Sequence, residues 1–303
     1  MEQRYTRNIP SLSEQQQKVI GTKHVLVAGC GGIGGYVAEY LARLGIGKLT
    51  LADSDTFEKT NLNRQLYATE ENIGKSKVVE IKERLQKVNP LVEADVWMSR
   101  LRESTAETAL KGKDLVIDCL DSVADRLMLE NVCGEAGLTL IHGALTGVQF
   151  QVMTVTPGSG SLRKFYDNNV CSPSKSTLSF VPGACAAVQV SEALKVLCGE
   201  EPALKDRMMV MDLKTVAMNI SDPGERIFAD REISIRIRKY NVTSEYSIPQ
   251  FATIRELLKA VEMEGENLFV LRNGAYVMPD TFDDPILEEG DLIEFRKSAA
   301  FGG

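Results

Sequence analysis

The feature that most constrains the fold is a glycine-rich hexapeptide, residues 29–34, that directly follows a short apolar run. Residues 24–28 (HVLVA) are apolar and rich in valine, which predicts a buried strand. Residues 29–34 read GCGGIG, and Val37, Leu41 and Leu44 then recur at helical spacing. A strand that turns through glycines into a helix leaves backbone N–H groups pointing at the turn, where they can bind phosphate. The sequence therefore predicts a strand–loop–helix unit with a nucleotide site.

Strands and helices continue to alternate after this unit. Apolar runs predict further strands at residues 49–51, 92–98, 114–118, 138–141, 148–155 and 208–211. Helical spacing predicts helices at residues 76–88 and 184–197, and another through Leu127, Leu129 and Val132. This alternation indicates an α/β fold with a Rossmann-like, doubly wound and mainly parallel sheet.

A second, smaller domain is expected near the C-terminus. The polar, turn-rich stretch 221–226 (SDPGER) predicts a boundary, and isoleucines then alternate at 233, 235 and 237. Residues 243–248 are the expected hairpin partner, residues 254–261 carry one amphipathic stripe, and further strands are expected at 268–271 and 292–295. Asn273-Gly274 is a hairpin signal. We expect a domain at residues 1–220, a linker at 221–231 and a small α+β domain of β-grasp (ubiquitin-like) type at 232–303.

Composition excludes several classes of function. The net charge of −7 argues against nucleic acid as a partner. The apolar runs are shorter than the roughly 18 residues that a membrane span needs, and the first residues form no apolar leader. Six cysteines occur without any CxxC pair, which is typical of reduced thiols. We therefore expect a cytoplasmic protein that binds neither membrane nor nucleic acid.

A glycine-rich loop alone does not identify the nucleotide. Asp53 follows Gly34 at a distance suited to a ribose contact, which fits NAD and ATP alike. Polar and cationic segments then follow at 61–65 (NLNRQ), 74–77 (GKSK) and 119–122 (CLDS). Hydride transfer needs no such density of cations beside the nucleotide. Phosphoryl or adenylyl transfer does, because charge builds up on phosphate oxygens in the transition state.

These motifs, in this order, resemble the ThiF/MoeB/HesA family of adenylating enzymes, the bacterial relatives of ubiquitin-activating enzymes. The resemblance covers about residues 4–220 and implies an adenylyltransferase that uses ATP and Mg²⁺. It implies that the phosphates face Gly29, Gly31, Gly32 and Gly34, and that Asp53 binds the ribose. It further implies that Asn61, Arg64 and Lys77 hold the triphosphate, that Asp121 coordinates Mg²⁺, and that Arg7 reaches across a homodimer to the partner's ATP.

Each of these residues also has a purely structural interpretation. Arg64 and Lys77, taken singly, could be solvated surface charges. Asn61 could cap a helix, and Asp121 could cap the helix that follows its strand. Because the residues occur together and in order, the functional interpretation is preferred.

The sequence departs from the family pattern in two places and leaves the role of one cysteine open. Family members usually carry two CxxC pairs that hold a structural zinc, whereas residues 162–166 (LRKFY) and 222–226 (DPGER) contain no cysteine, so we expect no zinc. The usual Cys-Thr-Asp-Asn is replaced by residues 119–122, which keep the aspartate. Cys171 lies in the segment where the family often carries a reactive cysteine, and it is either a reactive thiol or a bystander.

The C-terminal domain resembles the ThiS/MoaD sulfur carriers. The resemblance rests on residues 287–293 (LEEGDLI) followed ten residues later by Gly302-Gly303. It implies that the carboxylate of Gly303 attacks the α-phosphate of Mg·ATP and forms an acyl-adenylate. A sulfur donor would then convert this into a thiocarboxylate for cofactor biosynthesis, with Cys171 as a candidate intermediary. Whether the tail enters its own chain's site or a neighbour's stays open, as do the sulfur donor and the downstream pathway.

Two other functions remain as alternatives. One is an NAD-dependent oxidoreductase with an unrelated C-terminal module, which would not need Arg64 and Lys77. The other is a non-enzymatic nucleotide-binding scaffold whose β-grasp domain only recruits partners.

Overall fold

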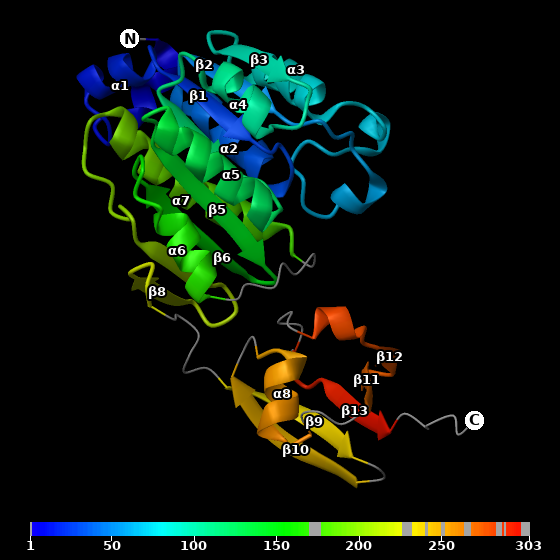
Figure 1. Ribbon diagram of the computed structural model, residues 1–303. Coiled ribbons are helices and arrows are strands. Elements are labelled where there is room, and N and C mark those ends of the chain that lie inside the picture. Colours follow the sequence, from blue (N-terminus) through cyan, green and yellow to red (C-terminus); the bar gives the residue numbers. More distant parts are fainter. Residues whose placement is uncertain are drawn as a thin grey trace. The chain divides into compact units, whose positions relative to one another are not determined.

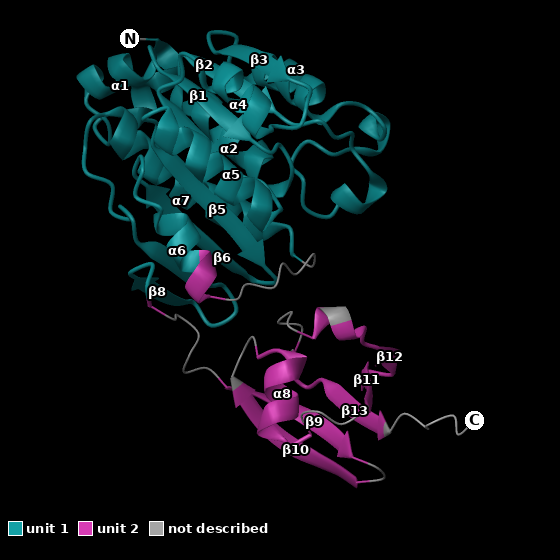
Figure 2. Ribbon diagram, in the orientation of Figure 1, with its two compact units in different colours: residues 1–165, 173–224 teal, residues 166–172, 225–303 magenta. Residues whose placement is uncertain are grey.

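The computed structural model describes residues 2–169, 177–225, 232–239, 242–249, 252–263, 268–282, 287 and 289–297. The chain divides into two compact units (Figure 2). The larger comprises residues 1–165 and 173–224, and the smaller comprises residues 166–172 and 225–303. Each unit is described by itself below.

The larger unit is built on an eight-stranded sheet in the order β3-β2-β1-β4-β5-β6-β7-β8 (Figure 1). Five neighbouring strands are parallel: β1 (His24–Ala28), β2 (Lys48–Ala52), β3 (Glu93–Trp97), β4 (Leu115–Asp118) and β5 (Leu140–Thr146). Three antiparallel strands complete the sheet: β6 (Gln149–Val155), β7 (Met208–Asp212) and β8 (Ala217–Ser221). The predicted Rossmann-like, mainly parallel sheet is confirmed.

Helices cover the sheet on both faces. On one face, α2 (Gly32–Leu44) packs against α7 (Phe180–Leu197), and their apolar residues share one core with alternate residues of β1, β2 and β4. On the other, α4 (Glu103–Leu110) packs against α5 (Val123–Glu135), which also contacts β4 and β5 (Figure 1). The remaining helices are η1 (Gln3–Asn8), α1 (Glu14–Ile20), η2 (Lys59–Asn61), η3 (Glu70–Asn72), α3 (Lys77–Val88) and α6 (Ser161–Asn168).

The long helix α7 is apolar enough, with a mean hydropathy of 1.3 over 18 residues, to span a membrane by length and composition. Within the described part of the chain it is the one helix that passes this test, and half of it is buried. Its residues Val181, Cys185 and Val190 belong to the core beneath the sheet. The hydropathy of α7 is therefore accounted for by its packing.

The smaller unit has a five-stranded sheet in the order β10-β9-β13-β11-β12. Its elements are β9 (Glu232–Lys239), β10 (Val242–Pro249), α8 (Ile254–Ala260), β11 (Leu268–Arg272), β12 (Ala275–Tyr276), η4 (Pro279–Thr281) and β13 (Leu292–Lys297). β13 lies parallel to β9 and antiparallel to β11. The alternating isoleucines of β9 share a core with Ile254 and Leu257 of α8. Among the described residues, this mixed sheet and α8 have the order of elements expected of a β-grasp arrangement.

Local signals placed most elements correctly, and the differences have physical causes. Asn273 and Gly274 both have positive φ, 52° and 84°, as a two-residue hairpin turn requires. Strand β8 was not predicted because it is an edge strand with Ala217, Met218 and Asn219 exposed, so it lacks an alternating apolar pattern. Its last residue, Ser221, falls in the stretch expected to be the linker 221–231.

A close backbone approach joins β1 to α2. A Cβ on Gly34 would lie 1.9 Å from the carbonyl oxygen of Gly29, a separation that no real side chain shows. Gly29 has φ +85°, and a Cβ there would lie 2.7 Å from the carbonyl oxygen of Cys119 at the end of β4. The loop therefore needs glycine at both positions to bring β1, β4 and the start of α2 together.

We predict that Gly34→Ala destabilises the protein by at least about 2–3 kcal/mol, because backbone must move to admit the methyl group. Gly32→Ala is the matched control. Its Cβ would meet the Pro182 ring at 3.4 Å, an ordinary contact, so the free energy of unfolding should change by less than about 1 kcal/mol. Urea unfolding followed by circular dichroism measures both, and equal stability of the two variants would contradict the packing described.

Candidate functional site

The glycine loop lies where the strand order reverses. From β1 the chain proceeds through α2 to β2 on one side, and it later returns through β4 on the other side of β1. In such sheets the crevice at the carboxyl ends of the two central strands is the usual ligand site. Residues 29–34 and 119–122 occupy this position because they follow β1 and β4.

The loop presents backbone donors at the start of α2. Gly31 is the N-cap residue of α2 and has no side chain to cap it. The N–H groups of Gly32, Ile33 and Gly34 have no acceptor among the described residues. Unpaired N–H groups and the positive end of the helix dipole together favour an anion. The loop can therefore bind phosphate.

Asp53 fastens the loop to the end of β2. Its Oδ2 accepts a hydrogen bond from the backbone N–H of Cys30 at 2.7 Å, and its Oδ1 accepts one from Asp55 N–H at 2.8 Å. Its own N–H donates to the carbonyl oxygen of Trp97 at 3.1 Å. Each carboxylate oxygen keeps a further lone pair, so Asp53 can still accept from a ribose hydroxyl.

Lys77 is a buried cation beside this loop. It is only 6% exposed, and its Nζ lies 3.0 Å from Oδ2 of Asp55. Burial raises the pKa of the Cys30 thiol well above its ordinary value, the charge of Asp53 raises it further, and the charge of Lys77 opposes both. Lys77 and Asp53 therefore act on the same loop electrostatically, and Lys77 is not a solvated surface charge.

Arg64 and Asn61 come from the turn that faces the start of α2. Arg64 donates from Nη1 to the carbonyl oxygen of Thr60 and to Oδ1 of Asn63, both at 2.9 Å. Its Cγ would lie 3.9 Å from a Cβ on Gly32, so its stem borders the glycine loop. The Oδ1 of Asn61 accepts from Glu58 N–H at 3.0 Å and so caps η2, while its amide nitrogen remains as a donor for a ligand.

Asp121 follows β4 on the opposite side of the loop. It is exposed and forms no hydrogen bond or ion pair with the described residues. The neighbouring residue Ser122, not Asp121, is the N-cap of α5. Arg126 donates from Nε and Nη2 to the carbonyl oxygen of Leu120, at 3.0 and 2.7 Å, and so fixes the turn that carries Asp121. A carboxylate in this position suits Mg²⁺.

A buried polar group that the sequence did not reveal supports this end of the sheet. His142 on β5 and Asp118 on β4 are fully buried, and Nδ1 of His142 lies 2.7 Å from Oδ2 of Asp118. Burial lowers the pKa of His142, and Asp118 opposes that shift. Gln189 of α7 donates to the carbonyl oxygens of Asp118 and Ile141. In the sequence, Asp118 only ends an apolar run. The pair could not be predicted from it because its partner, His142, lies on another strand.

Arg7 lies away from the glycine loop of its own chain. It belongs to η1, where the buried Tyr5 ring packs against Gly45, the C-cap of α2. Asn89 donates to the Tyr5 hydroxyl at 2.8 Å. The 13 residues of α2 span about 20 Å, so η1 and the loop lie at opposite ends of this helix. The role of Arg7 across a homodimer stays a prediction.

Three predicted residues, Cys171, Gly302 and Gly303, lie outside the described residues. Of the other five cysteines, Cys30, Cys119, Cys133 and Cys185 are buried and Cys198 is partly exposed. Burial raises the pKa of each of the four buried thiols, to about 12 for Cys133, so packing explains them.

The absence of a structural zinc stays a prediction. The two stretches where the family carries cysteine pairs have none, and no group of three metal-binding side chains occurs among the described residues. Protein contacts join these stretches instead. The Lys164 side chain lies against Gly224, and Asn169 donates to the carbonyl oxygen of Glu225 at 3.0 Å.

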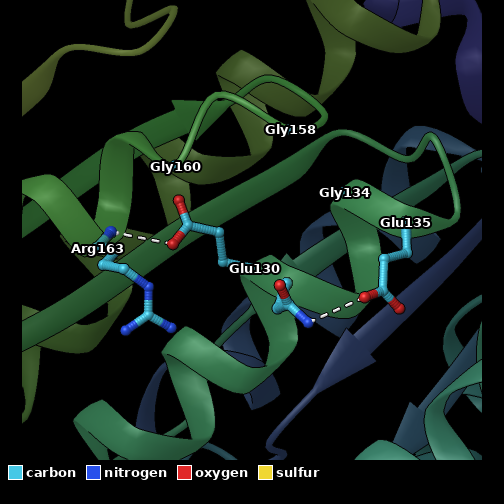
Figure 3. A pocket seen from close by; sticks show the side chains of 7 residues that line it. Glu130, Gly134, Glu135, Gly158, Gly160 and Arg163 are labelled. Carbon is cyan, nitrogen blue, oxygen red and sulfur yellow. Dashed lines mark hydrogen bonds between the residues drawn. The ribbon is translucent and has the colours of Figure 1, made fainter.

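A separate pocket of about 290 Å³ lies at the far end of α5 (Figure 3). The carboxylate of Glu130 there accepts from the backbone N–H groups of Leu162 and Arg163, at 2.8 and 3.0 Å, and so caps α6. Burial raises the pKa of Glu130, and these two donors oppose the shift. None of the predicted site residues lines this pocket, and its buried carboxylate anchors a helix.

A family model and two relatives match mainly the larger unit of this chain. The family model described as the ThiF family matches residues 5–226. The SAMP-activating enzyme E1 of Haloferax volcanii is 29% identical over 220 residues, covering 69% of this chain and 80% of that protein. The adenylyltransferase and sulfurtransferase MOCS3 of Xenopus laevis is 32% identical over 225 residues, covering 69% of this chain and 48% of that protein.

A solved structure shares the fold. The crystal structure of E. coli MccB with ATP superposes with a TM-score of 0.63 at 22% identity, covering 75% of this chain and 72% of that chain. The family match ends at residue 226, before the β-grasp strands of the smaller unit. The match spans residues 5–226, which is well over half of this chain. The chain therefore belongs to the ThiF family.

Proposed function

We propose that this protein is an ATP-dependent adenylyltransferase that activates the C-terminal carboxylate of a ubiquitin-like protein. The observation that supports this best is the glycine loop with unpaired N–H groups, bordered by two cations and faced by an unpaired carboxylate across the crevice. The relatives named E1, adenylyltransferase and sulfurtransferase support the same class of reaction.

The chain's own residues bind and orient ATP. The loop holds phosphate oxygens through backbone N–H groups, Asp53 accepts from the ribose, and Lys77 and Arg64 offset the negative charge that develops during transfer. Asn61 adds an amide donor. Asp121 would hold Mg²⁺, which when bound neutralises phosphate charge and orients the leaving pyrophosphate. Arg7 would come from the partner of a homodimer.

We further propose that the substrate carboxylate is that of Gly303 in the same polypeptide chain or in another copy. A carboxylate oxygen attacks the α-phosphorus of ATP, the bond from this phosphorus to the bridging oxygen breaks, and pyrophosphate leaves as the acyl-adenylate forms. A sulfur nucleophile from a donor protein or small molecule then displaces AMP and leaves a thiocarboxylate. Gly302 and Gly303 suit this role because neither has a side chain to obstruct a narrow channel. Cys171 is a candidate carrier of the acyl or sulfur group, in a reducing cytosol.

The two alternatives make different chemical demands. An NAD-dependent oxidoreductase would use the same loop but would not need a buried lysine beside it. A scaffold would bind nucleotide without exchanging pyrophosphate. Membership of the ThiF family favours adenylyl transfer over both.

Removing the buried cation should abolish most of the activity. We expect Lys77→Met to lower ATP–pyrophosphate exchange about 100-fold, because one charge that stabilises the transition state is lost. Lys75→Met is the matched control, since Lys75 is 58% exposed and lies 3.8 Å from Glu80. Exchange at the wild-type rate in Lys77→Met, with an unchanged melting temperature, would argue against this role.

Deleting Gly302-Gly303 should abolish ATP–pyrophosphate exchange when no separate carrier is added. The reason is that exchange requires a carboxylate acceptor for AMP. Exchange is measured with radiolabelled pyrophosphate in the full chain and in the deletion variant. Undiminished exchange in the deletion variant would show that the tail is not the acceptor.

Mixing two inactive variants tests which site the tail enters. One variant carries Asp121→Ala with an intact tail, and the other lacks Gly302-Gly303 with an intact site. Recovery of exchange in the mixture is expected if the tail of one chain enters the site of another. No recovery, with each variant folded and dimerising with the other, would mean that activation occurs within one chain.

A further inference from the structure

We infer that Gln65 is a nucleotide-contacting residue whose carboxamide donates a hydrogen bond to a phosphate oxygen on the loop 29–34. The motif 61–65 supplies Asn61 and Arg64 to the proposed function, but Gln65 has no part in it so far. The inference rests on that proposed function only in taking the bound anion to be a nucleotide phosphate.

Gln65 lies over the start of α2. Its backbone N–H donates to the carbonyl oxygen of Asn61 at 2.9 Å, which fixes the residue in the turn after η2. Its Nε2 would lie 3.6 Å from a Cβ on Gly31, the N-cap of α2. The carboxamide is therefore held against the loop whose N–H groups are unpaired.

Both polar atoms of this carboxamide are unpaired among the described residues, and its oxygen is buried. Gln65 is only 7% exposed, its Oε1 is buried without a hydrogen-bond partner, and its Nε2 forms no hydrogen bond with the described residues. Buried polar groups are nearly always paired, so an unpaired one needs an explanation. The inference does not depend on which carboxamide atom is nitrogen, because the group offers a donor in either orientation.

Other buried glutamines of the larger unit show how unusual this is. Gln17, 6% exposed, accepts from Asn8 at 2.7 Å and donates to the carbonyl oxygen of Leu44 at 2.8 Å. Gln189, which is fully buried, donates to two carbonyl oxygens of the sheet. Both are satisfied within the fold, whereas Gln65 is not.

The hydrogen-bond donors and the positive charge around Gln65 favour an anionic ligand. The unpaired N–H groups of Gly32, Ile33 and Gly34 belong to the same loop end, and Arg64 immediately precedes Gln65 in the chain. A neutral amide adds a donor there without adding charge. A phosphate oxygen would satisfy the donor, and a water molecule that accompanies the ligand would satisfy the acceptor.

The test compares stability and binding in the full chain. Gln65→Met replaces the carboxamide with an apolar group of similar length, and Gln65→Glu places a negative charge against the phosphate. We expect Gln65→Met to melt at or above the wild-type temperature without nucleotide, because an unpaired buried group has been removed. Its Kd for Mg·ATP, measured by calorimetry, should rise about tenfold. Gln65→Glu should weaken binding further.

Gln86→Met is the control, because Gln86 is exposed on α3 and should change neither quantity. Wild-type affinity in Gln65→Met would overturn the inference while the proposed function stands. A wild-type chain that does not bind Mg·ATP would overturn both. A wild-type chain that binds Mg·ATP but exchanges no pyrophosphate would overturn the proposed function alone, and weaker binding by Gln65→Met would then still support the inference.

Discussion

The backbone contact between Gly29 and Gly34 is the constraint on which the site depends. It lets α2 begin directly over the end of β1, so that the helix points its positive end into the crevice between β1 and β4. A side chain on Gly34 would push the helix away from the end of β1, and one on Gly29 would collide with the backbone of Cys119 after β4. The hydrogen bond from Cys30 N–H to Asp53 then fastens the same loop to β2. One loop is thus held by three neighbouring strands, which suits a site that must keep its donors fixed during transfer.

Local structure positions the charged side chains around this loop. The 3₁₀ turn at 59–61 is closed by Asn61, and the residues after it place the stem of Arg64 and the carboxamide of Gln65 over the start of α2. Lys77 begins α3 and is held by Asp55, which follows the aspartate that binds the loop. Lys77 is therefore part of the buried framework of the crevice, whereas the guanidinium of Arg64 is partly exposed and is oriented by Thr60 and Asn63.

The parts of this site that could be predicted from sequence are those with local signals. The glycine loop, the strand that precedes it and the aspartate after β2 each follow from spacing and residue type. Local pattern could not decide whether Asp121 or Ser122 caps α5, because both residue types cap helices. It also missed the Asp118–His142 pair and the unpaired Gln65, because both depend on which distant segments meet. Strand β8 could not be predicted from local pattern either, because an exposed edge strand needs no alternating apolar residues.

The two glycine motifs of the chain meet opposite physical demands. The loop at 29–34 needs glycine because its backbone is held in one crowded conformation. In the proposed role, Gly302-Gly303 would instead benefit from the many backbone conformations that glycine allows. The smaller unit has its own core, which includes isoleucine, leucine and phenylalanine side chains. Under the proposed function, the smaller unit is a substrate tethered to its enzyme, and its separate core lets it be tethered without altering the site. Tethering raises the local concentration of the tail only where the connecting chain can span the distance. Under the proposed function, the six residues 298–303, which can span at most about 20 Å, would help decide whether the tail serves its own site or another copy's.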